Sequence, residues 1–95
     1  MSQVNSKHVE ILISGRVQGV FYRASARTKA LQLEILGYTE NRADGRVKIM
    51  ASGHPASVQK LIDWCQIGPF GANVKKVMVE DKPMDESYET FEIRD

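Results

Sequence analysis

Hydrophobic and polar positions alternate near the start of the chain and then recur at helical spacing. From His8 to Ser14 every second residue is apolar, as in a strand whose side chains point alternately to two faces. Leu12 is apolar on the otherwise polar face, which indicates a central strand. The next stripe predicts a helix from about Tyr22 to Leu33. That stripe consists of Phe21, Ala24, Thr28, Leu31 and Ile35.

The middle of the chain predicts a β-hairpin. A second strand begins at Gly37-Tyr38 and should end near Asn41 to Ala43. Asp44-Gly45 is a typical two-residue hairpin turn, because both residues tolerate the backbone angles that such a turn needs. A third strand of alternating pattern then runs from Arg46 to Ala51.

A second helix and two further strands complete the pattern. Pro55 marks the start of this helix, which should end around Ile67-Gly68-Pro69. We expect Asn73 to Asp81 to form a strand, and Phe91 with Ile93 to lie in a short last strand. The cysteine belongs to the apolar stripe of the second helix, so we expect it to be buried. That stripe consists of Val58, Leu61, Ile62 and Cys65.

The first six of these elements follow the order β-α-β-β-α-β, which is the split βαβ pattern of the ferredoxin-like fold. It predicts an α+β sandwich in which both helices cover one face of an antiparallel sheet. A chain of 95 residues is long enough for one hydrophobic core, so we expect a single domain over residues 1–95.

The composition excludes several classes of protein. The chain is 42% hydrophobic and 26% charged, as in ordinary globular proteins, and no apolar run is long enough to span a bilayer or direct secretion. We therefore expect a cytoplasmic protein without membrane contact. One cysteine excludes an internal disulfide and, with only His8 and His54 beside it, predicts no metal site. We expect both histidines at the surface rather than acting as catalytic bases.

Charge is balanced over the whole chain but not locally. The 13 basic and 12 acidic residues leave a net charge of +1, too little for the broad basic face of a duplex-binding protein. Between Ile11 and Leu33 there are four cations and no acid, whereas Glu80 to Asp95 holds seven acids and two cations. A small anion would therefore be attracted to the first of these segments.

The connection from the first strand to the first helix, Ser14 to Arg23, has the composition of an anion site. Gly15 and Gly19 permit backbone angles at which consecutive N–H groups point inward, and a helix start adds unpaired N–H groups and a positive dipole end. The guanidinium of Arg23 can grip two oxygens of a phosphoryl group. Two glycines in such a connection can also form an ordinary turn, and no Gly-Lys-Ser or Gly-Lys-Thr of the common nucleotide-binding loop follows.

Hydrolysis at such a site would also need a positioned water, and Asn41 is the candidate. It lies near the end of the second strand, where its carboxamide could hydrogen-bond a water molecule. The alternative is turn chemistry, because asparagine is common just before an Asp-Gly turn.

Taken together, these motifs resemble the acylphosphatase family over nearly the whole chain. The resemblance is carried by Gly15-Arg16-Val17-Gln18-Gly19-Val20-Phe21-Tyr22-Arg23, Leu36-Gly37-Tyr38 leading to Asn41, Asp44-Gly45-Arg46-Val47, Gly53, Leu61, Trp64, Gly68-Pro69, Val74 and Phe91-Glu92-Ile93. The chain departs from the family's common pattern at Tyr38-Thr39-Glu40, at Gly68-Pro69-Phe70-Gly71 and at Tyr22, where phenylalanine is frequent. Strand alternation should direct Glu40 to the face opposite Asn41.

The resemblance implies hydrolysis of small acyl phosphates to a carboxylate and inorganic phosphate. It implies that Arg23 binds the phosphate and that Asn41 orients the attacking water, while the backbone of one loop cradles the phosphoryl group. The residues of this cradle are Arg16, Val17, Gln18, Gly19 and Val20. A carboxylate departs without a proton, because its conjugate acid has a pKa of about 4, so we expect neither a metal nor a cofactor.

Two other functions stay open at this point. The same fold and loop could form a non-catalytic module that binds a phosphorylated small molecule or carbamoyl phosphate. RNA-recognition modules share the order of elements, but they stack bases on aromatic residues of the central strands, and the strand from Arg46 to Ala51 has none. We expect a monomeric enzyme with a small-molecule substrate and no nucleic-acid partner.

Overall fold

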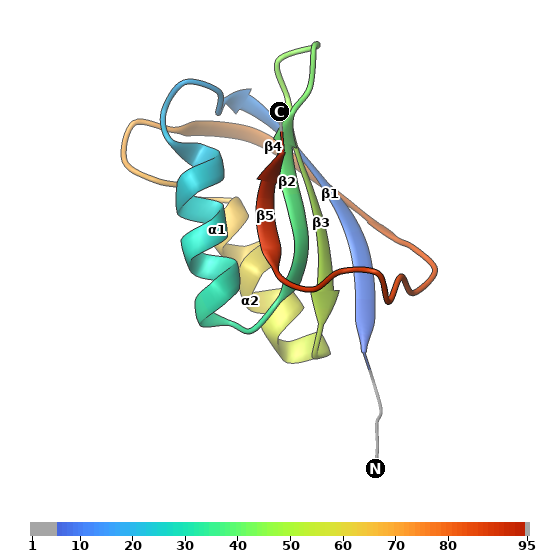
Figure 1. Ribbon diagram of the computed structural model, residues 1–95. Helices are drawn as coiled ribbons and strands as arrows, with labels where there is room; N and C mark the ends of the chain where they lie inside the picture. Colours follow the sequence, from blue (N-terminus) through green and yellow to red (C-terminus); the bar gives the residue numbers. More distant parts are fainter. Residues whose placement is uncertain (1–5, 95) are drawn as a thin grey trace.

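The computed structural model describes residues 6–94, which form two helices and five strands (Figure 1). In chain order these are β1 (Lys7–Arg16), α1 (Tyr22–Gln32), β2 (Leu36–Asn41), β3 (Val47–Gly53), α2 (Pro55–Cys65), β4 (Asn73–Asp81) and β5 (Phe91–Arg94). The predicted ferredoxin-like α+β class is confirmed, and the predicted segments differ from these mainly at their ends. Within the described range neither helix has the length and apolar character to cross a bilayer.

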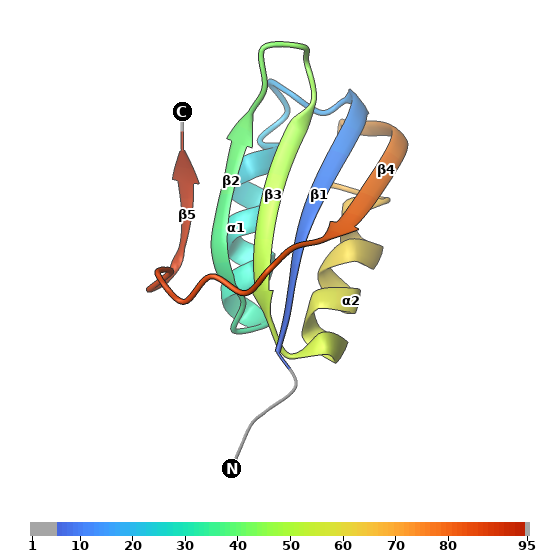
Figure 2. The ribbon, with the colours of Figure 1, turned by 90° about the vertical axis from the view of Figure 1, so that its right-hand side faces the viewer.

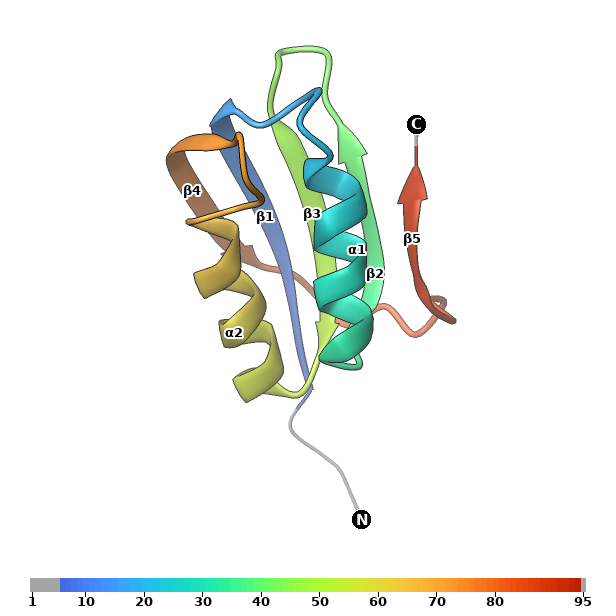
Figure 3. The ribbon, with the colours of Figure 1, turned by 90° about the vertical axis from the view of Figure 1, so that its left-hand side faces the viewer.

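The five strands form one sheet in the order β4-β1-β3-β2-β5. β1 lies between β3 and β4, which confirms the central position that the apolar Leu12 indicated. Both helices cover the same face of the sheet, which Figure 2 shows from the open side and Figure 3 from the helix side. One face of the sheet therefore builds the core, and the other is left for the connection between β4 and β5.

The expectation of a wholly antiparallel sheet is wrong at one edge. The four strands from β4 to β2 pair antiparallel, but β5 pairs parallel with β2, with Gly37 opposite Phe91. Residues 82–90, the crossing segment, run over the open face from β4 at one edge to β5 at the other (Figure 2). The chain thus enters β5 in the same direction as β2.

The core lies between the sheet and the two helices. Alternate residues of β1 and β3 are buried there, and so is the predicted stripe of α2. The apolar residues that these three elements contribute are Val9, Ile11, Ile13, Val47, Ile49, Ala51, Val58, Leu61, Ile62 and Cys65. Burial raises the pKa of the Cys65 thiol to about 12, so this thiol stays protonated and unreactive at neutral pH.

The predicted apolar face of α1 is wrong. Phe21 is 82% exposed and Leu31 is 41% exposed, whereas Tyr22, Ala26 and Ala30 are buried in the core. Alanines one turn apart let a helix approach a sheet closely, and such small side chains stand out little in a hydrophobicity pattern. Side-chain size therefore decides which face of α1 packs against the sheet.

Tyr22 joins the two helices. Its hydroxyl donates a 2.7 Å hydrogen bond to the carbonyl oxygen of Cys65 at the end of α2. Its ring centroid lies 5.3 Å from that of Trp64. Burial raises the pKa of Tyr22 far above its usual range, so the hydroxyl keeps its proton and remains a donor.

His8 is buried, which overturns the expectation that both histidines lie at the surface. Its Nδ1 lies 2.6 Å from the carbonyl oxygen of Pro83, which can only accept, so Nδ1 carries the proton. Nε2 then accepts from the Tyr88 hydroxyl at 3.0 Å. These two bonds fasten the crossing segment to the open face of the sheet.

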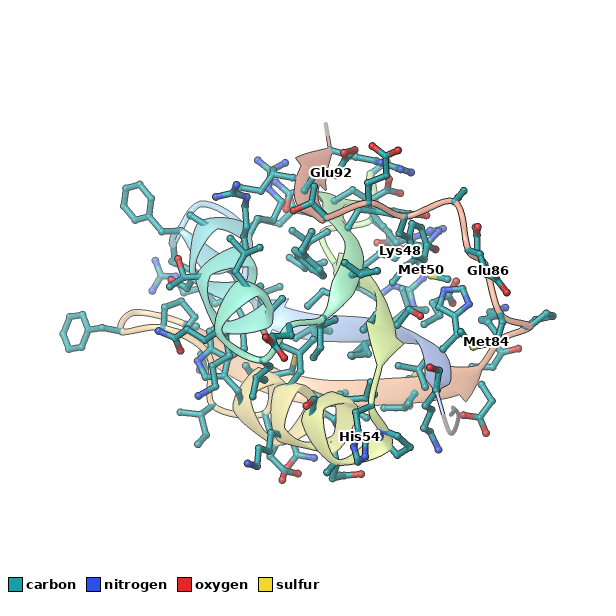
Figure 4. The ribbon with its side chains drawn as sticks, turned by 60° about the horizontal axis from the view of Figure 1, so that its bottom comes forward. Lys48, Met50, His54, Met84, Glu86 and Glu92 are labelled. Carbon is teal, nitrogen blue, oxygen red and sulfur yellow. The ribbon has the colours of Figure 1, made fainter. Side chains whose placement is uncertain are left out.

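The other histidine, His54, is exposed as predicted and directly precedes α2 (Figure 4). Its ring accepts a 3.1 Å hydrogen bond from the backbone N–H of Ala56 and so caps the helix. Both histidines therefore have structural partners. In the same view Met50 of β3 faces the crossing segment, which carries Met84 and Glu86.

The hydroxyl of Tyr22 gives a direct test of this packing. Tyr22→Phe removes the donor to the Cys65 carbonyl but keeps the ring, so the free energy of unfolding should fall by about 1–2 kcal/mol. Urea denaturation would measure this loss. Tyr38→Phe is the control, because Tyr38 is half-buried on the open face of the sheet, and it should change stability less. Equal effects of the two substitutions would contradict the role assigned to the Tyr22 hydroxyl.

Candidate active site

The loop between β1 and α1 has an unusual backbone. Two of its residues have positive φ angles, Gly19 at 77° and Phe21 at 61°, and so has Gly15 near the end of β1, at 123°. A Cβ on Gly15 would clash with the carbonyl oxygen of Asn73 on β4, where the pairing of the two strands shifts register. A Cβ on Gly19 would meet no atom within 4 Å, so glycine is favoured there by its backbone angle alone.

A hollow of about 250 Å³ opens where this loop enters α1. It is lined by Val17, Gly19, Phe21, Tyr22, Arg23, Ala24, Asn41 and Ile93. Figure 3 shows that the loop, the end of β2 and the end of β5 lie at the same end of the molecule. The fold thus brings Arg23 and Asn41, which come from different elements, to one place.

Arg23 lies in the first turn of α1 and is half-buried. Its Nη1 donates a 2.9 Å hydrogen bond to the carbonyl oxygen of Arg94 in β5. In the next turn the Nε of Arg27 donates to the carbonyl oxygen of Phe91 at 3.2 Å. Two arginines of α1 are therefore attached to the last strand, and the bond of Arg23 to Arg94 orients the guanidinium that lines the hollow.

Asn41 is the last residue of β2 and stands on the helix-facing side of the sheet. Thr39, two residues earlier on the same face, is fully buried. Asn41 lines the hollow, whereas Glu40 does not. Glu40 pairs in register with Lys48 and Arg94 of the neighbouring strands. The expected separation of Glu40 from the site is thus confirmed.

Gln18 has a side-chain role that the sequence reasoning missed. Its Nε2 donates to the carbonyl oxygens of Arg42 at 2.8 Å and Arg46 at 2.9 Å. Both carbonyls belong to the turn that follows Asn41, where the Asp44 carboxylate lies 2.8 Å from Nη2 of Arg46. Gln18 therefore ties the glycine loop to the hairpin that carries Asn41. No local sequence pattern predicts such a contact.

The same turn holds a charge pair that stabilises its shape. Hydrogen bonds from Arg46 hold the pKa of the Asp44 carboxyl below its usual range, so Asp44 stays ionised at neutral pH. Both groups are solvent-accessible, and the pair contributes to local geometry more than to overall stability.

The predicted cradle is only partly exposed to the hollow. Val17 and Gly19 line it, although the Val17 side chain is buried in the core. Arg16 ends β1 at the surface, opposite Asn73. Val20 packs against the core, and neither Arg16, Gln18 nor Val20 lines the hollow.

The electrostatic environment of the hollow favours an anion. Phe21 provides no side-chain cap to α1, and the first turn of the helix contains no acid. The N–H groups at a helix start and its positive dipole end attract negative charge when no side chain neutralises them. Among the described residues that line the hollow, none is a histidine or a carboxylate. Within residues 6–94 no three potential ligand side chains gather as they would around a metal ion.

The fold and the site together define an α+β sandwich with a hollow at a strand-to-helix loop, lined by a guanidinium and a carboxamide. A model of the family described as Acylphosphatase matches residues 9–93. The chain is 46% identical over 85 residues to an acylphosphatase of Acaryochloris marina, covering 90% of each chain. It is 42% identical over 89 residues to one of Rubrobacter xylanophilus, covering 94% of this chain and 81% of the relative.

A solved structure gives the same result. The acylphosphatase of Coxiella burnetii superposes with a TM-score of 0.91 at 36% identity, covering 95% of this chain and 94% of that one. The chain therefore belongs to the acylphosphatase family. It is a hydrolase that acts on the mixed anhydride of acyl phosphates, which decides against the alternative of a non-catalytic module.

The tie made by Gln18 can be tested by removing its donors. Gln18→Met keeps the length of the side chain but loses both hydrogen bonds, so the glycine loop and the hairpin should separate. Because a misplacement of about 1 Å can cost a hundredfold, kcat/KM for an acyl phosphate should fall by about ten- to a hundredfold.

Gln59 provides the matched control, because its amide is hydrogen-bonded to Asp63 on the exposed face of α2. Gln59→Met should keep the wild-type kcat/KM. Equal activity of the two variants would show that the Gln18 tie does not position the site.

Proposed function

We propose that the hollow at the start of α1 holds the phosphoryl group of an acyl phosphate and that Asn41 orients the water that attacks it. Arg23 and backbone N–H groups of the loop, of which Val17 and Gly19 line the hollow, would bind the phosphate oxygens. The observation that carries this proposal is the convergence of an uncapped helix start, a guanidinium and a carboxamide on one hollow.

The proposed site supplies what phosphoryl transfer needs. Charge accumulates on the equatorial oxygens of the transferred group, and fixed N–H donors with one guanidinium stabilise it. The water oxygen bonds to phosphorus as the bond from phosphorus to the acyl oxygen breaks. The acyl group leaves as a carboxylate.

The proton of the attacking water needs an acceptor. Asn41 has no basic site at neutral pH, so it can align the water but cannot deprotonate it. We assign the proton to a nonbridging oxygen of the phosphoryl group. The reaction then requires no acid, base or metal from the protein, because the carboxylate leaves unprotonated. Phosphate monoesters, which expel a more basic alkoxide, should be poor substrates.

The proposal also covers the oligomeric state, the location and the cofactor need of the protein. All the residues assigned to the site come from one chain, so the site would be complete in a monomer. We propose a single domain over residues 1–95 that works as a monomer in the cytoplasm and needs no cofactor.

Arg23→Lys tests the phosphate contact. Lysine keeps the positive charge but loses the planar two-pronged grip, so KM should rise and kcat should fall by about a hundredfold. Hydrolysis of benzoyl phosphate, followed by its ultraviolet absorbance, measures both constants. Arg27→Lys one turn further along α1 is the control, since Arg27 does not line the hollow, and wild-type activity of Arg23→Lys would refute the assignment.

Asn41→Ala tests the positioning of water. The variant should lose about a hundredfold or more in kcat, because the oriented water is lost while the phosphate contacts persist. Competitive inhibition by inorganic phosphate reports on those contacts separately and should be retained. Loss of phosphate inhibition together with kcat would instead place Asn41 among the phosphate ligands.

The pH dependence of kcat tests the proton path. Without a protein base, kcat should stay nearly constant from about pH 5 to 8 once the substrate is fully ionised. A protein base of pKa about 6 to 7 would make kcat decline below that pH, since the base would become protonated. A sloping profile that disappears in a histidine variant would contradict the proposed path.

A further inference from the structure

The lining of the hollow has an apolar part that the phosphate does not use. Gly19, Arg23 and Asn41 supply the polar groups of the proposed site, while the side chains of Val17 and Tyr22 are each only 1% exposed and out of reach. Three lining residues are left that are apolar and accessible. They are Phe21, Ala24 and Ile93.

Phe21 has no evident role in folding. Its side chain is 82% exposed, so it packs little against the core. Its backbone has φ 61° and ψ 27°, a left-handed conformation that is unfavourable for a bulky side chain. The exposed ring adds little to stability while the left-handed backbone costs free energy, and strain of this kind is concentrated at functional sites.

The size of the hollow leaves room beside the phosphate. A water molecule occupies roughly 30 Å³ in the liquid, and a phosphoryl group fills about the space of two or three. The hollow measures about 250 Å³, so several carbon atoms fit in the remainder. Within the described lining, Arg23 is the one charged side chain, and the phosphate would engage it. An acyl group with its own carboxylate would find no second cation there.

We propose that Phe21, together with Ala24 and Ile93, forms an acyl subsite that selects substrates with extended apolar acyl groups. Aromatic and medium-chain alkanoyl phosphates are then the preferred class, and acetyl phosphate or acyl phosphates with charged tails are poor substrates. The inference rests on the proposed function, because it takes the phosphoryl end to lie at Arg23 and Asn41.

The test compares three substrates: acetyl phosphate, hexanoyl phosphate and benzoyl phosphate. Their leaving groups are carboxylates of similar basicity, so differences in kcat/KM report on acyl contacts more than on intrinsic reactivity. The wild-type protein should prefer hexanoyl and benzoyl phosphate over acetyl phosphate by about tenfold, the selectivity that a small apolar pocket provides.

Phe21→Ala should remove most of that preference and lower the ratio of benzoyl to acetyl kcat/KM by about tenfold. Phe21→Gly should do the same, and it provides a second variant that adopts the positive φ without strain and so preserves the loop. The matched control is Phe70→Ala, because Phe70 is also exposed but does not line the hollow. This variant should keep the wild-type ratio.

Inhibition by inorganic phosphate, which has no acyl group, reports on the cradle alone. A fall in the substrate ratio with an unaltered phosphate inhibition constant supports the subsite. A rise of that constant in parallel with the fall would show a deformed cradle and overturn the inference. Hydrolysis of all three substrates with a ratio that Phe21 does not affect would overturn the subsite alone. Failure of the wild-type protein to hydrolyse any of them would overturn the proposed function as well.

Discussion

The geometry of this protein depends on the left-handed backbone of the loop that joins β1 to α1. The chain reverses direction over the five residues between the two elements. Positive φ angles at Gly19 and Phe21, with that of Gly15 just before them in β1, make the turn sharp enough. As a result, α1 starts beside the ends of β2 and β5 with its first N–H groups uncapped. A helix start acts as roughly half a positive charge, so the loop places main-chain donors where an anion is favoured.

Three parts of the fold hold the side chains of the site around that loop. Gln18 joins the loop to the hairpin after Asn41, Arg23 is attached to the carbonyl of Arg94, and the pairing of β2 with β3 places Asn41 at the edge of the hollow. These contacts link segments that are distant in sequence. Neutral hydrogen bonds each contribute about 1 kcal/mol, so their value to the site is mainly geometric.

The small number of functional groups in the proposed site agrees with the chemistry of the family. An acyl phosphate has a leaving group that needs no proton, and a phosphoryl group can be stabilised by fixed donors without a basic side chain. The proposed site therefore needs two side chains and the N–H groups of one loop, all on the helix side of the sheet. The open face has a structural task. There the crossing segment is held by the two hydrogen bonds of His8.

Much of the fold could be predicted because short-range patterns reflect which face of an element is buried. The alternation in β1 and the stripe of α2 gave the right elements, and together these gave the right class. Asp44-Gly45 marked the hairpin correctly, but the predicted two-residue turn is wrong: residues 42–46 connect β2 to β3, and of the pair Gly45 has a positive φ while Asp44 does not. The pattern of α1 misled because its buried face is built on Ala26 and Ala30, which are small rather than strongly apolar. Arg23 and Asn41 were candidates from the glycine loop and from the need for a positioned water, the family resemblance implied their roles, and only the structure shows that both line one hollow.

By itself the sequence determined the elements, the glycine positions and the excess of positive charge near the first helix, because each depends on residues close together in the chain. Tertiary structure decided the parallel direction of β5, the burial of His8, the hydrogen bonds of Gln18 to the hairpin, and the apolar lining of the hollow at Phe21 and Ile93. Those features depend on which distant segments meet. Contacts of this kind are selected by the packing of the whole chain, and no local pattern encodes them.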